Sequence, residues 1–323
     1  MKQGLLICGH GTRHPHGLDE FAQLTRDIEE HLDDNIVRYG YLEFARPIIR
    51  DGLDALRHEG CAIVHALPAM LFAAGHVKND IPSVLNNYAL QHPSMRIILG
   101  RELGITSGML RAAEARIRSS LASSPVSYHD TLLMVVGRGA SDPDANSHIA
   151  KITRMLWEGM GFGWAESAFS GMTFPLVAPA LEKAVKLGMK QIVVFPYMLF
   201  DGVLVQRIYH HTDLVAKQYP QTRFVKAPYL NNHPDVVSTF LQRLQEIHTP
   251  DNAMNCQLCK YRERIVGFEH DVGTAQMSHH DHAEGEQTHT HQQHTHHHPP
   301  YPHADHPLGP LSMSLYDKDM TKT

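Results

Sequence analysis

Short runs of aliphatic residues alternate along the chain with longer stretches in which apolar residues recur every three to four positions. In residues 1–124 the short runs predict strands near Leu5–Cys8, Ile36–Leu42, Ala62–Ala66 and Arg96–Leu99. The longer stretches predict helices near Leu18–Leu32, Ile48–His58, Ile81–Gln91 and Thr106–Ser120. This alternation is typical of βαβ units around a parallel sheet.

The same alternation returns in residues 125–248, after a polar connector at 119–125. Strands are predicted near Leu132–Val136, Gly163–Phe169, Gln191–Phe195 and Arg223–Lys226. Helices are predicted near Ala145–Met160, Val177–Leu187, Leu204–Gln218 and Pro234–Ile247. The expected fold is therefore α/β, with two tandem, doubly wound parallel-sheet lobes at 1–124 and 125–248.

The two halves are copies of one another at an offset of 128 positions. Leu5–Gly11 aligns with Leu133–Gly139, and Leu67–Phe72 aligns with Phe195–Phe200. Internal similarity at a fixed period is a strong indicator of a repeated architecture. The alignment of the last segment requires a deletion of one residue in the second copy. Three polar residues of the first copy are not repeated in the second. His10, Glu43 and His76 of the first copy stand opposite Arg138, Gly171 and Val203 of the second.

Each member of this unrepeated trio follows a predicted strand. His10 follows the first strand, Glu43 the second and His76 the third, and the carboxyl ends of parallel strands share one rim of the sheet. Two imidazoles and a carboxylate suit a divalent first-row metal, and a neutral imidazole can also accept a proton. The alternative is that each histidine is an incidental polar residue at a strand end.

Composition limits the classes of protein to be considered. The chain has 323 residues, 42% of them hydrophobic, which suits about two globular domains. A net charge of −5 with histidine neutral argues against a general nucleic-acid binder. No apolar run has the length of a membrane span, and no signal peptide is evident. Because four cysteines do not make a disulfide framework, we expect a cytoplasmic protein.

Residues 249–323 depart from the α/β pattern. Cys256 and Cys259 form a Cys-x-x-Cys pair, which can share one metal or a cluster edge but is too small for a four-cysteine cluster unless a homodimer supplies four thiolates. The alternative is an exposed pair that oxidises adventitiously. Eleven histidines lie between His279 and His306, in a stretch expected to be disordered. They form either a reservoir of divalent metal ions or an inert, metal-binding tail.

Three segments resemble a known family. Gly9-His10-Gly11-Thr12-Arg13, the Glu43 segment and 67–76 resemble the sirohydrochlorin cobaltochelatases, which are ATP-independent class II chelatases of cobalamin biosynthesis. The resemblance covers residues 1 to about 248. The Met-x-Cys-x-x-Cys segment at 254–259 and the histidine-rich tail resemble the long form of that family, in which this segment is associated with an iron–sulfur centre.

The resemblance implies that sirohydrochlorin lies between the lobes and that cobalt(II), the substrate ion, enters its ring. Two pyrrole protons must then leave, because metal ligands bind in deprotonated form. His10 is assigned as the proton acceptor, while His76 and Glu43 hold and deliver cobalt; the roles of the two histidines can be exchanged. No nucleotide is expected, since the sequence has no P-loop.

Sirohydrochlorin is rich in carboxylates, so basic residues near the rim are candidate substrate ligands. The candidates are Arg13, Arg46, Lys78, Arg138 and Arg207. Arg138 is distinctive because it replaces the histidine at the equivalent strand end, where a guanidinium can clamp a carboxylate. Each of these residues can alternatively be a solvated surface charge.

Other functions stay open. The same macrocycle could receive ferrous or nickel ions, because one borderline site accepts several divalent metals. In a non-catalytic metal-storage or metal-chaperone protein, the histidine-rich tail would carry the main function and the rim histidines would be secondary. An iron oxygenase with two histidines and one carboxylate is disfavoured by the doubly wound lobes and by the lack of a local His-x-Asp/Glu pair.

Overall fold

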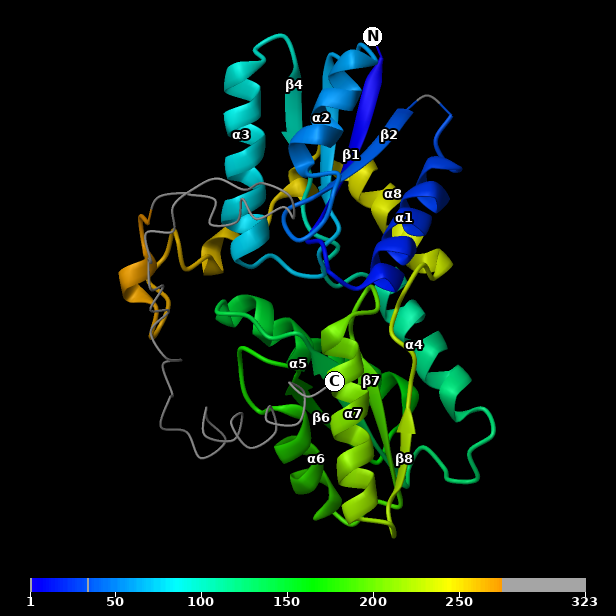
Figure 1. Ribbon diagram of the computed structural model, residues 1–323. Helices are drawn as coiled ribbons and strands as arrows, with labels where there is room; N and C mark the ends of the chain where they lie inside the picture. Colours follow the sequence, from blue (N-terminus) through cyan, green and yellow to red (C-terminus); the bar gives the residue numbers. More distant parts are fainter. Residues whose placement is uncertain (1, 34, 275–323) are drawn as a thin grey trace.

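The computed structural model describes residues 2–33 and 35–274 and shows two lobes, one above the other (Figure 1). Lobe one is built on the sheet β2-β1-β3-β4 and lobe two on the sheet β6-β5-β7-β8. All neighbouring strands within each sheet are parallel. The expected fold class is confirmed. Within the described part of the chain, no helix has the length and apolar composition needed to cross a membrane.

The first copy contains four strands and four helices in alternation. The strands are β1 Gln3–Gly9, β2 Asn35–Tyr41, β3 Ile63–Pro68 and β4 Arg96–Leu99. The helices are α1 Pro15–Glu29, α2 Ile49–His58, α3 Ile81–Gln91 and α4 Ser107–Leu121, and a π-helical turn, η1 His76–Asp80, precedes α3. Helix α1 begins three residues before the predicted start because Pro15, whose ring fixes φ, occupies its first turn.

The second copy has the same order of elements. Its strands are β5 Thr131–Gly137, β6 Trp164–Phe169, β7 Gln191–Pro196 and β8 Arg223–Lys226. Its helices are α5 Pro143–Met160, α6 Val177–Val185, α7 Val203–Gln218 and α8 Pro234–Glu246. Three short 3-10 turns follow, η2 Pro250–Asn252, η3 Cys256–Leu258 and η4 Glu269–Asp271.

The internal repeat extends to unusual backbone conformations. The Arg46–Pro47 and Phe174–Pro175 peptide bonds are both cis, 128 positions apart. At the same offset, Phe44 and Met172 have positive φ angles of 65° and 62°. The loops after the second strand of each lobe therefore share these backbone features at equivalent positions, although their side chains differ.

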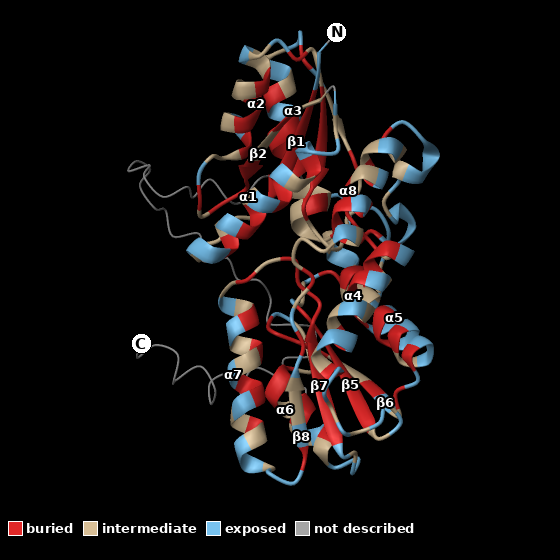
Figure 2. Ribbon diagram, turned by 90° about the vertical axis from the view of Figure 1, so that its right-hand side faces the viewer, coloured by how far each residue is buried: buried red, intermediate tan, exposed pale blue. Residues whose placement is uncertain are grey.

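The central strands carry the core. Leu5, Leu6, Ile7 and Cys8 of β1 are fully buried, as expected for a parallel strand with helices on both faces. Figure 2 shows the buried residues concentrated along the strands of both lobes. One apolar cluster contains residues of both sheets, so the core is continuous between the lobes.

The last helix of each copy packs on the other lobe. Helix α4 contacts α5 and β8 of lobe two, whereas α8 returns to contact α1 and β3 of lobe one (Figure 1). The two helices also pack on each other. Arg243 of α8 donates to the carbonyl oxygen of Leu103 (2.6 Å), and Arg116 of α4 donates to that of Leu230 (2.9 Å). The last helix of each copy thus belongs to the interface between the lobes.

Because the last helix of each copy packs on the other lobe, we expect the two lobes to unfold together. Phe240 of α8 is fully buried in the shared cluster. Phe240→Ala should lower the free energy of unfolding by about 3–5 kcal/mol, and calorimetry should still show one transition. Leu90→Ala is the control, since Leu90 is 81% exposed. Two separate transitions, one for each lobe, would contradict the coupling.

Candidate functional site

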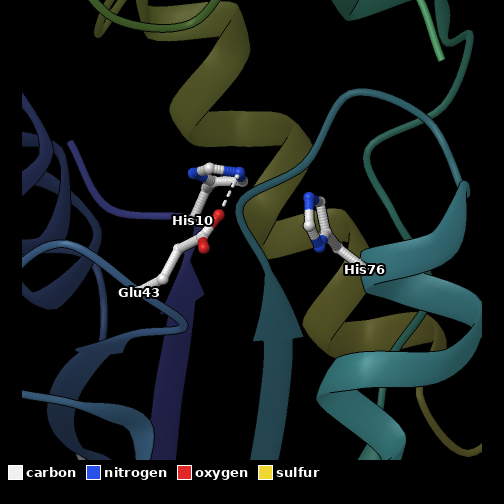
Figure 3. Close-up of side chains that lie close together, drawn as sticks. All are labelled: His10, Glu43 and His76. Carbon is white, nitrogen blue, oxygen red and sulfur yellow. Dashed lines mark ion pairs between the residues drawn. The ribbon is translucent and has the colours of Figure 1, made fainter. Parts of the chain in front are cut away.

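Three side chains converge at the carboxyl ends of β1, β2 and β3. His10, Glu43 and His76 each offer one ligand atom, and these atoms lie within 4.8 Å of one another (Figure 3). Among the residues that the structure describes, they are the only group of three or more His, Cys, Asp or Glu side chains arranged in this way. The sequence-predicted trio is thus brought together, as a metal site would require.

Backbone contacts place His10 beside Glu43. Gly11 has a φ of +92°, and a Cβ atom there would lie 1.8 Å from the carbonyl oxygen of Glu43. Only glycine allows this approach. The Glu43 N–H donates to the His10 carbonyl oxygen (3.0 Å), which joins the two loops directly. Glu43 is buried, so its carboxylate is directed by protein contacts on most sides.

The His10 ring has a partner for Nε2 in either protonation state. Its Nδ1–H donates to the Gly11 carbonyl oxygen (2.9 Å), so in the neutral ring the lone pair lies on Nε2. Arg138 Nη2 can donate to this atom (3.1 Å), and Glu43 Oε1 lies 3.0 Å from it. A protonated Nε2 would donate to Glu43 instead. The arrangement therefore suits an imidazole that gains and loses a proton.

His76 is held in the tautomer that a metal ligand needs. Its Nδ1 lies 2.8 Å from Asp80 Oδ2, and the Nδ1–H donates a hydrogen bond to this carboxylate. The neutral ring then carries its lone pair on Nε2, and the ring lies edge-on to His10 with centroids 4.7 Å apart. Burial lowers the pKa of His76 below that of an ordinary histidine; His10 and Arg138 add to this effect, and the hydrogen bond to Asp80 opposes it. A neutral ring is the metal-binding form.

A cavity of about 470 Å³ lies between the lobes and includes His10 and His76 in its wall. Its wall also contains aromatic rings from both lobes, among them Phe44, Phe72 and Tyr197. The rings of Phe72 and Tyr197 are nearly parallel, with centroids 5.8 Å apart. Such a cavity has mostly apolar walls and a few polar side chains, which is typical of a small-molecule or cofactor site.

The five predicted basic residues have different surroundings. Arg13 and Arg138 line the cavity, and the Arg13 guanidinium lies 5.2 Å from the centre of the Phe44 ring. Arg46 pairs with Asp51 at the surface (3.2 Å), and neither Arg46 nor Arg207 contributes to the cavity wall.

Lys78 is directed into lobe two. Its ammonium is buried between Asp142 (2.7 Å) and Asp144 (3.6 Å) of lobe two, and the residue is not part of the cavity wall. The expected contact with a substrate carboxylate does not fit this geometry, because the two aspartates already bind the charge.

Asp80 is a direct partner of the trio that the sequence interpretation missed. A carboxylate that accepts a hydrogen bond from the second ring N–H of a metal-binding histidine fixes the tautomer and the orientation of the ring. The signal was the His-x-x-x-Asp spacing of 76–80, which places both side chains on one side of a helical turn.

The two cysteines of the C-terminal segment lie apart from the trio. Cys256 is exposed, Cys259 is buried, and neither forms a disulfide. Within residues 2–33 and 35–274 they belong to no group of three or more metal-binding side chains. The described residues therefore do not complete the ligand set of a four-ligand cluster. The expected disorder and metal binding of the histidine-rich stretch fall on residues 275–323, outside the described part.

A family comparison agrees with the internal repeat. The CbiX family model matches the chain twice, over residues 4–120 and 132–247. The chain belongs to the CbiX family. Each matched range contains the four strands of one sheet except the first residue of its first strand, and the first range contains the whole trio.

Named relatives span most of the chain. The sirohydrochlorin cobaltochelatase of Priestia megaterium is 35% identical over 82% of this chain and 86% of its own length. The sirohydrochlorin ferrochelatase of Bacillus subtilis strain 168 is 29% identical over 76% of this chain and 92% of its own. The crystal structure of the sirohydrochlorin chelatase SirB from B. subtilis subspecies spizizenii in complex with cobalt has a TM-score of 0.66 and 26% identity, covering 78% of this chain and 97% of that one.

The role of Asp80 can be tested on metal binding alone. Asp80→Ala should lower the cobalt(II) affinity of the trio by about 10–100-fold, because the His76 ring loses the partner that fixes its tautomer. Titration calorimetry without tetrapyrrole measures this change. Asp213→Ala, which removes an exposed partner of Lys226, is the matched control. Unchanged affinity in Asp80→Ala would show that the His76–Asp80 contact is only structural.

Proposed function

We propose that this CbiX protein is a sirohydrochlorin cobaltochelatase, which inserts cobalt(II) into sirohydrochlorin with release of two protons and without ATP. The observation that carries the proposal is the convergence of His10, Glu43 and His76 at the wall of a cavity between the lobes. The cobaltochelatase name of the P. megaterium relative supports the choice of metal.

The site would hold cobalt by two imidazoles and one carboxylate. Imidazole nitrogen is a borderline donor and carboxylate oxygen a hard donor, and both suit a divalent first-row ion. The donor atoms would be His76 Nε2, His10 Nε2 and a carboxylate oxygen of Glu43. Three protein ligands leave coordination positions open, so the pyrrole nitrogens can replace protein ligands one after another. Asp80 keeps the His76 lone pair directed at the ion.

Proton removal would use His10. The two inner N–H groups of the macrocycle must lose their protons as the metal enters, because the nitrogens bind in deprotonated form. As the ion passes from His10 and Glu43 to the macrocycle nitrogens, the freed His10 Nε2 can accept a proton and then donate it to Glu43 Oε1, 3.0 Å away. Bulk water then receives the protons, so two protons are released for each metal ion inserted.

The cavity would bind the macrocycle between the lobes. Aromatic rings of both lobes offer flat apolar surfaces, and Arg13 and Arg138 offer guanidinium groups for the peripheral carboxylates. Arg138 also donates to His10 when that ring is neutral, so it must leave Nε2 before the ring binds metal.

His10→Ala and His76→Ala test the chemistry. Each should lower the turnover of cobalt insertion by about 10²–10⁴-fold, the usual contribution of a general base, with little change in thermal stability. The measurement is the shift in tetrapyrrole absorption after mixing protein, sirohydrochlorin and cobalt(II). Variants that turn over at the wild-type rate would contradict the assignment.

Iron is the second candidate metal, because the B. subtilis relative is named a ferrochelatase. The same assay with ferrous and nickel ions in parallel ranks the metals by kcat/KM. A higher kcat/KM for iron than for cobalt would move the proposal from cobalt to iron, without changing the roles of the trio.

The histidine-rich stretch would serve as a reservoir. Truncation after Thr274 should leave turnover at saturating cobalt unchanged and lower it when cobalt is scarce. The number of ions bound at neutral pH should fall, because the eleven imidazoles between His279 and His306 are removed. Equal metal stoichiometry in the two proteins would exclude the reservoir. Loss of turnover at saturating cobalt would instead place the stretch in the reaction itself.

An iron–sulfur centre at Cys256 and Cys259 would need ligands from outside the described residues, such as those of a second copy in a homodimer. The proposed insertion of cobalt requires no such centre. Iron and sulfide analysis of anaerobically purified protein, with Cys256→Ala as control, tests for it.

A further inference from the structure

We propose that Lys78 is a positioning residue that holds His76 in place for metal binding. The inference rests on the proposed function, in which His76 is a ligand of the incoming ion. The observation that carries it is a buried ion pair between Lys78 of lobe one and two aspartates of lobe two, Asp142 and Asp144.

The ion pair is enclosed on all sides. The side chains of Lys78, Asp142 and Asp144 are 4%, 0% and 5% exposed, and the ammonium lies 2.7 and 3.6 Å from the two carboxylates. Buried charges need partners of opposite sign, because removal from water is otherwise too unfavourable. Lys78 therefore joins the lobes by a contact that cannot be exchanged for water without opening the interface.

This contact acts on the turn that carries His76. Lys78 and His76 both belong to η1, two residues apart, and the Lys78 N–H donates to the Ala74 carbonyl oxygen (2.8 Å). A shift of the ammonium would therefore shift the backbone next to His76. The same turn also carries Asp80, the partner of the His76 ring.

The lobe-two side of this ion pair is also connected to the metal site. Asp142 is the N-cap of α5, where its side chain accepts from the Asp144 N–H (3.1 Å). Asp142 ends the short loop that begins at Arg138, whose guanidinium donates to His10. In the metal-free protein, the ion pair thus connects the His76 turn to the lobe-two loop that contacts His10.

The C-terminal segment covers the same contact. Asn255 Nδ2 donates to Asp144 Oδ1 (3.1 Å), and the Tyr261 hydroxyl lies 3.5 Å from the position of a Cβ at Gly75, directly before His76. Lys78 is therefore enclosed between lobe two and this segment, and it is not part of the cavity wall. Its geometry suits positioning rather than contact with the macrocycle.

The test compares cobalt binding with tetrapyrrole binding. Full-length wild type, His76→Ala and Lys78→Met are titrated with cobalt(II) in the absence of sirohydrochlorin. Histidines of the tail contribute equally to all three, so the site of the trio is the binding step that His76→Ala removes. Lys78→Met should weaken this step by about 10–100-fold, the usual effect of losing a group that orients a ligand. Its affinity for metal-free sirohydrochlorin, followed by absorption, should equal that of the wild type.

Matched variants separate positioning from folding. Lys78→Arg keeps the charge and should restore most of the cobalt affinity. Lys78→Met combined with Asp142→Asn removes one unpaired carboxylate but keeps an N-cap residue, and it should still bind cobalt weakly. Lys226→Met, which breaks an exposed pair with Asp213, should behave as wild type. Thermal unfolding of every variant shows which of them fold.

Two results would overturn the inference. One is wild-type cobalt affinity in a folded Lys78→Met or in the folded double variant. The other is weakened sirohydrochlorin binding with unchanged cobalt binding, which would make Lys78 a substrate ligand. If the wild type shows no step that depends on His76, the proposed function fails and this inference fails with it; the His76→Ala titration distinguishes that case.

Discussion

In both lobes, a glycine after the first strand lies against a backbone carbonyl of the loop after the second strand. A Cβ at Gly11 would lie 1.8 Å from the Glu43 carbonyl oxygen, and a Cβ at Gly139 would lie 1.9 Å from that of Gly171. Both glycines have a positive φ, and any side chain there would push the loops apart. The residue before each glycine is thereby held beside the loop after the second strand. In lobe one this places His10 next to Glu43, and the candidate metal site depends on it.

The two copies share this contact between the glycine and the second loop, but they carry different side chains beside it. Lobe one carries the trio, whereas the equivalent positions of lobe two carry Arg138, Gly171 and Val203. Arg138 reaches across to His10, so lobe two contributes a cation to the site although it has lost the ligands. Under the proposed function, one face of the cavity delivers the metal and the other helps to hold the anionic macrocycle. The exchanged helices α4 and α8 keep these faces in a fixed relation.

Much of this could be predicted from the sequence, because it depends on local patterns. Alternating strands and helices predicted the two sheets, and the repeat singled out the residues present in only one copy. The convergence of His10, Glu43 and His76 followed from their places at strand ends. The exchange of α4 and α8 could not be predicted, since an amphipathic helix shows that one side is buried but not which sheet it packs on.

The sequence also could not predict which partners the long basic side chains bind. Lys78 lies two residues from a trio member, which suggested a rim position, yet its four-carbon stem carries the charge into lobe two. Arg46 is similarly bound by Asp51, at a distance from the cavity wall. The Lys78 pairing joins segments that are 64 residues apart in the sequence, so only the folded chain reveals it.

The central claim is that His10, Glu43 and His76 bind the metal ion that is to be inserted. A crystal of the protein soaked with cobalt(II) and measured on both sides of the cobalt absorption edge tests it most directly. The account predicts an anomalous peak between the three side chains, within coordination distance of His10 Nε2, His76 Nε2 and a Glu43 carboxylate oxygen. Ordered cobalt found only elsewhere on lobe one or lobe two, with no peak at the trio, would contradict it.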